Sequence, residues 1–271
     1  MKEDKNRAGR QERKIRYSDD LIWGIHPVIE TLQAEEQRVT EVILQKDRRG
    51  SSWETLLELV KKAGIKYSFV ERISITGSPE EQIRHQGVVA RVTPVPLILF
   101  DDLLGQFSAA VKNGEIPRII ACDSIQDPHN LGAIIRSAHA AGVNKVLLPR
   151  ERSAPLGGTA AKASAGAISR VDICQVTNLS EALKAIKEAG GWIFGAVKDE
   201  NCQSIYETDF NIPACVVVGN EAQGIRPLVR RNCDVLISIP MAGTLDSLNS
   251  SVAGAVIMFE MHRQLLAIRD N

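Results

Sequence analysis

The second half of the chain alternates short apolar segments with segments that have helical periodicity. Runs such as RIIACDSI from Arg118 and PACVVVGNE from Pro213 contain few polar residues and no alternation of polar with apolar residues, as in strands that are buried on both faces. Strands of this kind separated by helices predict an α/β fold with a parallel sheet covered on both sides. The expected strands are 118–125, 145–149, 171–176, 192–197, 213–221 and 233–240, and the expected helices are 130–142, 157–170, 179–190 and about 249–268.

The first half of the chain also mixes helices and strands, which indicates a separate small domain. Its expected helices are 21–33 and 53–64, and its expected strands are 40–45, 66–70 and 86–92. Pro94 and Pro96 follow this region, and Gly114 and Pro117 precede the apolar strand at 118, so the segment between them reads as a connection. The predicted organisation is a basic disordered tail at 1–18, a first domain at 19–96, a linker at 97–116 and a second domain at 117–271.

Charge and composition exclude several classes of protein. The chain has 271 residues, of which 44% are hydrophobic, and its 33 Lys and Arg balance its 33 Asp and Glu. Residues 1–16, however, hold seven basic residues against three acidic ones and almost nothing apolar, which is typical of a disordered tail. This tail is either a solvated leader or an arm that touches phosphates. It lacks the apolar core of a signal peptide, and no apolar run is long enough to span a membrane.

The cysteines and histidines give no sign of a metal site. The five cysteines, Cys122, Cys174, Cys202, Cys215 and Cys233, are scattered without a CxxC pair, and the five histidines are dispersed as well. An odd, dispersed set of cysteines without a signal peptide fits a reducing cytoplasm, so we expect a cytoplasmic protein that needs no metal.

Ligands of open α/β sheets bind at the carboxyl ends of the strands, and three such ends here are polar. They read DSIQDPHN, GNEAQGIR and PMAGTLDSLN, and no GxGxxG, phosphate-loop or GxSxG motif accompanies them. The side chains that could converge there are Asn130, Arg136, Glu221, Ser247 and Asn249.

Each of these residues also has a purely structural interpretation. Asn130 suits the N-cap of the helix NLGAIIRSAHAAG, and Arg136 could extend to solvent from the flank of the same helix. Glu221 could be an acid in the first turn of a helix, while Ser247 and Asn249 could cap the last helix.

Three segments decide between these interpretations, because together they resemble a known family. NLGAIIR, VVVGNEAQGIR and ISIPMAGTLDSLNSSVAGAV are similar, in order and separation, to the three motifs of the SpoU/TrmH family of RNA ribose 2′-O-methyltransferases, which use S-adenosylmethionine (SAM). WGIHPVIE and HQGVVARV resemble the RNA-substrate-binding module of the same family, so the resemblance covers roughly residues 21–268.

The resemblance implies an architecture and a partner. The second domain would be a SPOUT α/β knot, with a parallel sheet and a trefoil knot, and the first a small L30e-like α/β domain that holds RNA. The family forms homodimers with active sites at the subunit interface, which would account for a last helix that is apolar nearly all round. The two-domain layout favours a guanosine of large-subunit (23S) ribosomal RNA as the substrate; a tRNA substrate, or a non-catalytic RNA-binding protein with the same fold, is the alternative.

The resemblance also assigns roles to residues. It places Arg136, Asn130, Glu221, Ser247 and Asn249 at the methyl-transfer site, with Arg136 acting either as a base or by orienting a substrate phosphate. Backbone groups at Gly219, Ile239 and Leu248, with Met241 nearby, would bind SAM. His85, Gln86 and Gly87 either start a strand or contact RNA.

Overall fold

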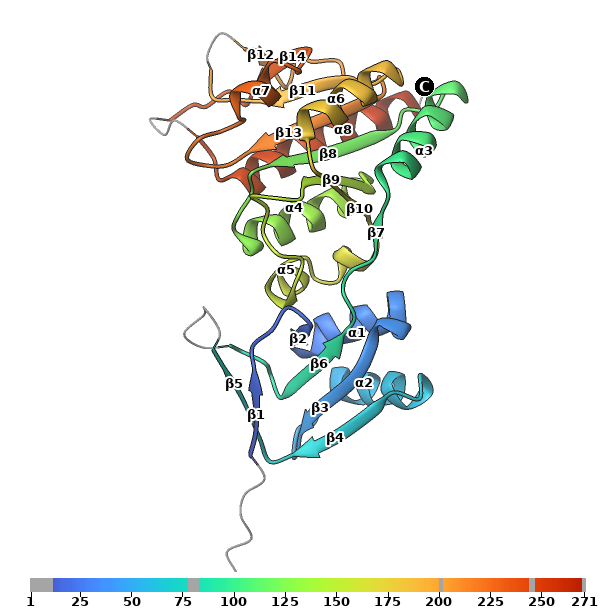
Figure 1. Cartoon of the computed structure of the whole chain (residues 1–271), viewed down its shortest axis with the longest axis vertical. Coiled ribbons are helices and arrows are strands. Elements are labelled where there is room, and N and C mark those ends of the chain that lie inside the picture. Colours follow the sequence, from blue (N-terminus) through green and yellow to red (C-terminus); the bar gives the residue numbers. More distant parts are fainter. Residues whose placement is uncertain (1–11, 78–82, 200–201, 244–246, 270–271) are drawn as a thin grey trace, which may run out of the picture. The chain divides into compact units, whose positions relative to one another are not determined.

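The structure is a computed structural model in which residues 12–77, 83–199, 202–243 and 247–269 are described. The chain divides into two compact units, Met1–Pro94 and Val95–Asn271 (Figure 1). The boundary falls at the two prolines that the sequence analysis placed between its domains.

Unit 1 contains a four-stranded mixed sheet, a two-stranded parallel sheet and two helices. Its elements are β1 (Glu12–Arg16), β2 (Leu21–Trp23), α1 (Ile25–Glu35), a 3₁₀ turn η1 (Glu36–Arg38), β3 (Val39–Gln45), α2 (Ser51–Lys62), β4 (Lys66–Val70), β5 (Arg72–Thr76) and β6 (Val88–Val92). The larger sheet has the order β2-β6-β3-β4, and β1 pairs with β5. A buried cluster that includes Trp23, Ile43 and Val89 joins residues of both sheets.

Two predictions for unit 1 were wrong in part. The segment 21–33 was expected to be one helix, but its first three residues form β2 and pair antiparallel with β6. Gly24, with φ of 97°, separates this strand from α1, and only glycine adopts that backbone conformation readily. The basic tail was expected to be disordered to residue 18, whereas residues 12–16 form β1; residues 1–11 lie outside the described residues.

Unit 2 is built on an eight-stranded sheet in which every strand pairing is parallel. Its order is β12-β14-β11-β13-β8-β9-β10-β7. The elements are β7 (Leu97–Ile98), α3 (Phe100–Lys112), β8 (Arg118–Asp123), α4 (Pro128–Ala140), β9 (Lys145–Pro149), α5 (Gly158–Ala163), a 3₁₀ turn η2 (Ala167–Ser169), β10 (Asp172–Val176), α6 (Leu179–Glu188), β11 (Trp192–Ala196), β12 (Gln203–Ser204), β13 (Ala214–Gly219), α7 (Pro227–Arg230), β14 (Val235–Ser238) and α8 (Ser250–Arg269).

Helices cover both faces of this sheet, as the apolar strands predicted. On one face α3 and α6 pack together over a cluster that includes Phe107, Ile119 and Leu183. On the other face α4 packs against α8 and α5 (Figure 1). Successive residues of β8 are all buried, which explains why its sequence has no polar alternation. The predicted α/β class with a parallel sheet is therefore confirmed.

Two local predictions for unit 2 were also wrong. The segment 97–116 was expected to be a linker with a helical stretch. The helix is present as α3, but the segment is part of unit 2, because β7 pairs with β10 and α3 contributes to the core. Asn130 was expected to cap its helix, but α4 begins at Pro128 and its N-cap is Asp127, whose carboxylate accepts a hydrogen bond from the His129 N–H at 2.9 Å. Asn130 lies within the first turn instead, so its side chain is available for other contacts.

Candidate active site

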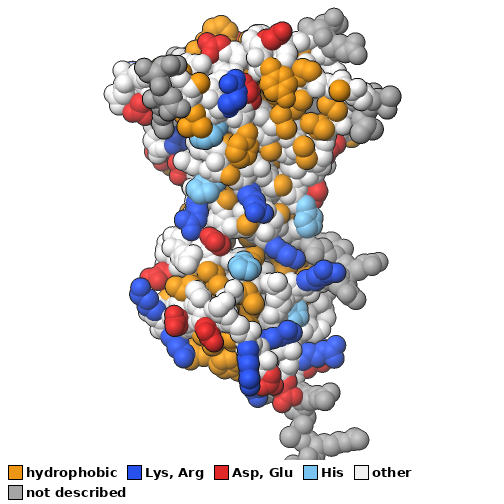
Figure 2. Space-filling model, turned by 180° about the vertical axis from the view of Figure 1, so that it is seen from behind, with side chains coloured by type: hydrophobic (Ala, Val, Ile, Leu, Met, Phe, Trp, Pro, Cys, Tyr) orange, Lys and Arg blue, Asp and Glu red, His pale blue; other side chains and the backbone are white. Residues whose placement is uncertain are grey.

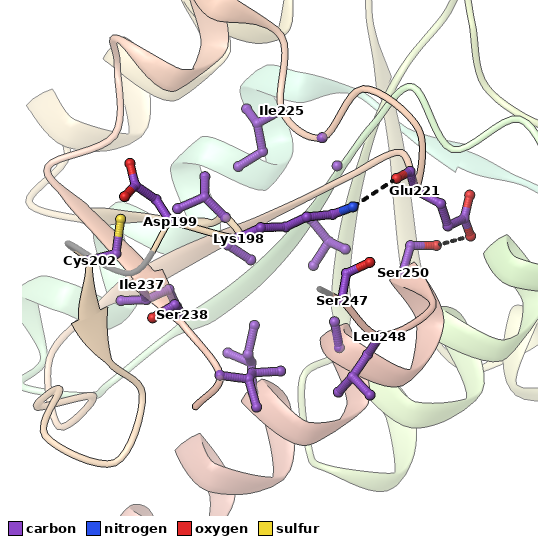
Figure 3. A pocket seen from close by; sticks show the side chains of 18 of the residues that line it. Lys198, Asp199, Cys202, Glu221, Ile225, Ile237, Ser238, Ser247, Leu248 and Ser250 are labelled. Carbon is purple, nitrogen blue, oxygen red and sulfur yellow. Dashed lines mark hydrogen bonds between the residues drawn. The ribbon is translucent and has the colours of Figure 1, made fainter. Parts of the chain in front are cut away.

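A cavity of about 1000 Å³ opens at the carboxyl ends of the parallel strands of unit 2 (Figure 3). Its walls come from the segments that follow β11, β13 and β14 and from the start of α8. This is the edge where open α/β sheets bind ligands, and two of the polar strand ends noted in the sequence, GNEAQGIR and PMAGTLDSLN, contribute residues to it.

The loop after β13 folds back tightly on Gly219. A Cβ atom on Gly219 would lie 2.2 Å from the carbonyl carbon of Gly224, so only glycine fits there. Asn220 and Gly224 exchange backbone hydrogen bonds of 3.2 and 2.7 Å, which closes the loop. Glu221 therefore lies at the tip of a narrow turn at the mouth of the cavity.

An ion pair between the partly exposed Arg226 and a buried carboxylate fixes the far end of this loop. Asp123, at the carboxyl end of β8, is fully buried and accepts hydrogen bonds from the backbone N–H of Arg226 at 2.8 Å and from its guanidinium Nε at 2.6 Å. The next residue, Ser124, has φ of 63°, and its carbonyl accepts a hydrogen bond from the Asn220 side chain at 3.3 Å. The end of β8 thus holds both ends of the loop that carries Glu221.

Three polar side chains from two other segments donate to one carboxylate oxygen of Glu221. Oε1 of Glu221 accepts hydrogen bonds from Asn130 Nδ2 at 2.6 Å, Ser250 Oγ at 2.7 Å and Asn249 Nδ2 at 3.2 Å. Asn249 Nδ2 also donates to Asn130 Oδ1 at 3.0 Å, which fixes the orientation of the Asn130 amide. Three residues predicted for the site, far apart in the chain, are thus brought together.

The residues that precede α8 both cap this helix and lie at the cavity, as the sequence suggested. Asn249 Oδ1 accepts a hydrogen bond from the Ser251 N–H at 2.9 Å, as an N-cap residue does. Ser247 and Leu248 line the cavity (Figure 3), although residues 244–246 of the same motif lie outside the described residues.

Arg136 is the one predicted methyl-transfer residue that a single chain brings neither to this cluster nor to the lining of the cavity. Its side chain is exposed, and it is not among the residues that line the cavity. It lies six residues after Asn130 on α4, which turns it about 120° around the helix axis and about 9 Å along it. It shares a face with Gly132, whose Cα packs against the backbone of α5.

The lining of the cavity fits an adenosyl group. Gly219, Ile239, Leu248 and Met241, the residues expected to bind SAM, all line it. Apolar side chains such as Ile225 and Ile257 provide a slot for a flat base, and the tight turn at Gly219 brings backbone groups to its wall. The volume is at the upper end of the range of about 300–1000 Å³ that is usual for small-molecule sites.

His85, Gln86 and Gly87 form a defined turn in unit 1. Gln86 has φ of 52°, and its Oε1 accepts a hydrogen bond from the Ile25 N–H at 3.1 Å at the start of α1. Nδ1 of His85 accepts one from the Gly87 N–H at 3.0 Å, and burial, with Arg48 nearby, lowers the pKa of His85. The turn thus has a structural role, whether or not it also contacts RNA.

Several residues at the site were missed by the sequence analysis. Ser250 and the Asp123–Arg226 pair take part in the geometry described above, and Lys198 lines the cavity with its Nζ donating to the Glu221 backbone carbonyl at 3.4 Å. Only Asp123 had a usable signal, an acidic residue at the end of an apolar strand. Cys202 also lines the cavity, and burial raises the pKa of its thiol, which disfavours the reactive thiolate.

The described residues contain neither a metal-binding cluster nor a membrane-spanning helix. No group of three or more His, Cys, Asp or Glu in this part of the chain is arranged to hold a metal ion. Among the same residues, no helix has both the length and the apolar character that a membrane span requires.

Comparison with known families identifies the class of protein that this fold and site define. Residues 117–259 match the model of the SpoU rRNA Methylase family, and residues 21–97 match the RNA 2′-O ribose methyltransferase substrate-binding domain. The chain therefore belongs to the SpoU rRNA methylase family. The class expected from the sequence, a SAM-dependent RNA ribose methyltransferase, is confirmed.

Individual relatives of known name cover almost the whole chain. The 23S rRNA (guanosine-2′-O-)-methyltransferase RlmB of Yersinia pestis is 39% identical over 90% of this chain and 97% of its own length. RlmB of Vibrio cholerae is 38% identical over 93% of this chain and all of its own. A putative TrmH family tRNA/rRNA methyltransferase of Bacillus subtilis, YacO, is 37% identical over 90% of this chain and 96% of its own.

Solved structures show the same fold at lower identity. The SpoU methyltransferase AviRb of Streptomyces viridochromogenes, in complex with the cofactor AdoMet, superimposes with a TM-score of 0.68 at 22% identity, over 91% of this chain and 90% of its own. An RNA 2′-O ribose methyltransferase superimposes with a TM-score of 0.66 at 20% identity, over 94% of this chain and all of its own.

Proposed function

We propose that this protein transfers a methyl group from SAM to the ribose 2′-hydroxyl of a guanosine in 23S ribosomal RNA, in the cytoplasm and as a homodimer. The polar cluster on Glu221 carries the proposal, because it gathers residues of all three motifs beside a cavity that fits an adenosyl group. The guanosine and the ribosomal substrate are supported by the names of the RlmB relatives.

The chemistry asks the protein mainly for positioning and for removal of a proton. A ribose hydroxyl is a poor nucleophile that must lose its proton as it attacks. SAM supplies a methyl group on a positively charged sulfur, which leaves as a neutral thioether. The side chains of Asn130, Asn249 and Ser250 are held in fixed orientations by Glu221, and we assign them the task of holding the ribose in line with the methyl group.

We assign Arg136 to the orientation of a substrate phosphate, which assists the departure of the 2′-hydroxyl proton to solvent, rather than to the role of base. A guanidinium carries five N–H donors and no acceptor, so it is a poor proton acceptor, whereas its planar fork suits two phosphate oxygens. Arg136 lies about 9 Å along α4 from Asn130 and does not line the cavity. Arg136 therefore either binds a phosphate outside the cavity of its own chain or acts at the active site of a second subunit.

An apolar stripe on α8 supports the homodimer. Val252, Phe259 and Leu266 are spaced seven residues apart and have exposed fractions of 47%, 47% and 44%. Residues seven apart lie on the same side of a helix, so the three form an apolar line along α8, with the exposed side chain of Arg263 beside it between Phe259 and Leu266. Figure 2 shows unit 2 from behind, where α8 packs against α4, and hydrophobic side chains are gathered on this surface.

Two further features belong to this proposal. Unit 1, with its four-stranded sheet and two helices, is the L30e-like domain that holds RNA, as its match to the substrate-binding family suggests. We also propose that the chain of unit 2 is threaded as a trefoil knot. The support is that Gly243 and Ser247, from the motif before α8, line the same cavity as the loop after β13.

Transfer of labelled methyl groups in vitro tests the proposal. Purified protein and labelled SAM are incubated separately with unmodified 23S ribosomal RNA and with a tRNA pool, and the product is digested to nucleosides. We expect label in 2′-O-methylguanosine from 23S RNA. Label in tRNA alone would favour the alternative substrate, which the name of YacO keeps open, and SAM binding without transfer to any RNA would indicate a non-catalytic RNA-binding protein.

A further inference from the structure

Of the two cationic side chains in the described lining of the cavity, one forms an ion pair and the other does not. The cations are Lys198 and Arg230, and the guanidinium of Arg230 donates to the Asp199 carboxylate at 3.2 Å. Lys198 forms no ion pair with any carboxylate among the described residues; the one contact of its Nζ given by the structure is the backbone carbonyl of Glu221, at 3.4 Å. One long hydrogen bond satisfies at most one of the three N–H donors of an ammonium group.

Lys198 is placed where it meets the polar part of a ligand. It follows β11, and in Figure 3 its side chain extends across the cavity with Nζ directed toward Glu221. Apolar side chains, among them Ile237 and Leu248, form other parts of the wall. An adenosyl group suits the apolar wall, so the amino-acid part of SAM falls to the polar side, where Lys198 lies.

We propose that the ammonium of Lys198 binds the carboxylate of the methionine part of SAM. The inference rests on the cofactor assignment made above. The carboxylate is the only negative charge in SAM, and Lys198 is the cation in the described lining that no carboxylate neutralises. The methionine side-chain carbons separate the carboxylate from the sulfonium, so a lysine that binds the first need not lie against the second.

A different role would also explain the observed contact. Lys198 could act only as a brace that holds the backbone of Glu221, and hence the loop after β13. The two roles predict different dependence on the ligand. A brace affects every ligand of the cavity equally, whereas a carboxylate partner affects only ligands that carry the carboxylate.

Calorimetric binding of two ligands separates the roles. Decarboxylated SAM keeps the adenosine, the sulfonium and the amine but lacks the carboxylate. We expect Lys198→Met to weaken SAM binding about tenfold or more, as for the loss of a hydrogen bond to a charged group, and to change the binding of decarboxylated SAM by less than about twofold. Lys198→Arg should keep most of the preference for SAM, because it keeps the charge.

Lys184→Met serves as the matched control, since Lys184 lies on α6 and is not among the cavity residues. It should leave both affinities unchanged, and a melting curve of each variant checks the fold. Equal weakening of both ligands in Lys198→Met would establish the brace and overturn the proposal, as would unchanged SAM binding. If the wild-type chain bound neither ligand, the cofactor assignment would fail, and this proposal with it.

Discussion

Arg136 lies exposed on α4 and is proposed to orient a phosphate of the RNA substrate. If it orients a substrate phosphate, Arg136→Ala should leave SAM binding and the melting temperature nearly unchanged, while methyl transfer falls by about 10²-fold or more, as expected when a positioning group is lost. Arg136→Lys should recover little, because an ammonium keeps the charge but not the two-pronged geometry.

The measurement for this prediction is transfer of labelled methyl groups to ribosomal RNA, with calorimetric SAM binding alongside. His139→Ala is a suitable control, because His139 is another exposed residue on α4, nearer its end. Turnover close to normal in Arg136→Ala would mean that Arg136 is only a solvated residue on the helix flank.

Gly219 offers a test of how the loop that carries Glu221 is built. A Cβ at this position would collide with backbone atoms of Gly224 and Ile225, which cannot rotate away as a side chain can. Gly219→Ala should therefore displace the loop, weaken SAM binding by at least about tenfold and reduce the free energy of unfolding by about 1–3 kcal/mol.

Gly105→Ala is the control for this substitution. Gly105 lies in α3 with nothing within 4 Å of its added Cβ, so alanine should stabilise the helix by about 0.5–1 kcal/mol. Urea unfolding and SAM titration of both variants provide the measurements. Unimpaired SAM binding in Gly219→Ala would show that the closed turn is not required for the cofactor.

At the scale of elements, α8 combines the site with the proposed dimer interface. Its start supplies Ser250 to the Glu221 cluster, and its exposed stripe contains Phe259. Phe259→Glu should convert the dimer to a 29.7 kDa monomer in sedimentation at micromolar concentration, because a charge would be buried in the interface without a partner.

Leu99→Glu is the comparison, since Leu99 is 70% exposed in the same unit but precedes α3. It should leave the sedimentation unchanged. If Arg136 serves the second subunit, Phe259→Glu should also lose methyl transfer. A monomeric wild-type chain with full activity would contradict the dimer and that role of Arg136 together.

Elements with local signals were predictable from the sequence. The apolar strands of unit 2 and the helices between them follow from periodicity, and the family motifs pointed to Asn130, Glu221 and Asn249 before any geometry was known. Elements that depend on distant partners were not predictable. β1 is a strand because it pairs with β5, some sixty residues away, and its basic composition gives no hint of that pairing.

Boundary errors had a different cause, which is turn chemistry. Asp127 followed by Pro128 is a strong signal for the start of a helix, and it competed with Asn130 three residues later. Gly24 similarly divides a segment whose apolar residues fit a helix on periodicity alone. The separation of Arg136 from Asn130 follows from their six-residue spacing on one helix, but the family resemblance groups the two residues by role and not by contact.

At the scale of the molecule, we expect unit 2 to bind SAM and unit 1 to bind RNA. A chain that consists of Val95–Asn271 keeps β7, α3 and the whole cavity, so it should bind SAM as the full chain does. It should lose most of its affinity for ribosomal RNA, because the substrate-binding match lies in residues 21–97. Fluorescence anisotropy with an RNA fragment measures this loss, and undiminished RNA binding would show that unit 1 is not the substrate holder.

The central claim is methylation of a guanosine ribose in 23S ribosomal RNA. Mapping of 2′-O-methyl groups in ribosomal RNA and tRNA, from cells with and without the gene, tests it most directly. The account predicts that one 2′-O-methylguanosine in 23S RNA disappears without the gene, returns with the wild-type gene and does not return with the Arg136→Ala gene. An unchanged 23S RNA, or a loss confined to tRNA, would contradict it.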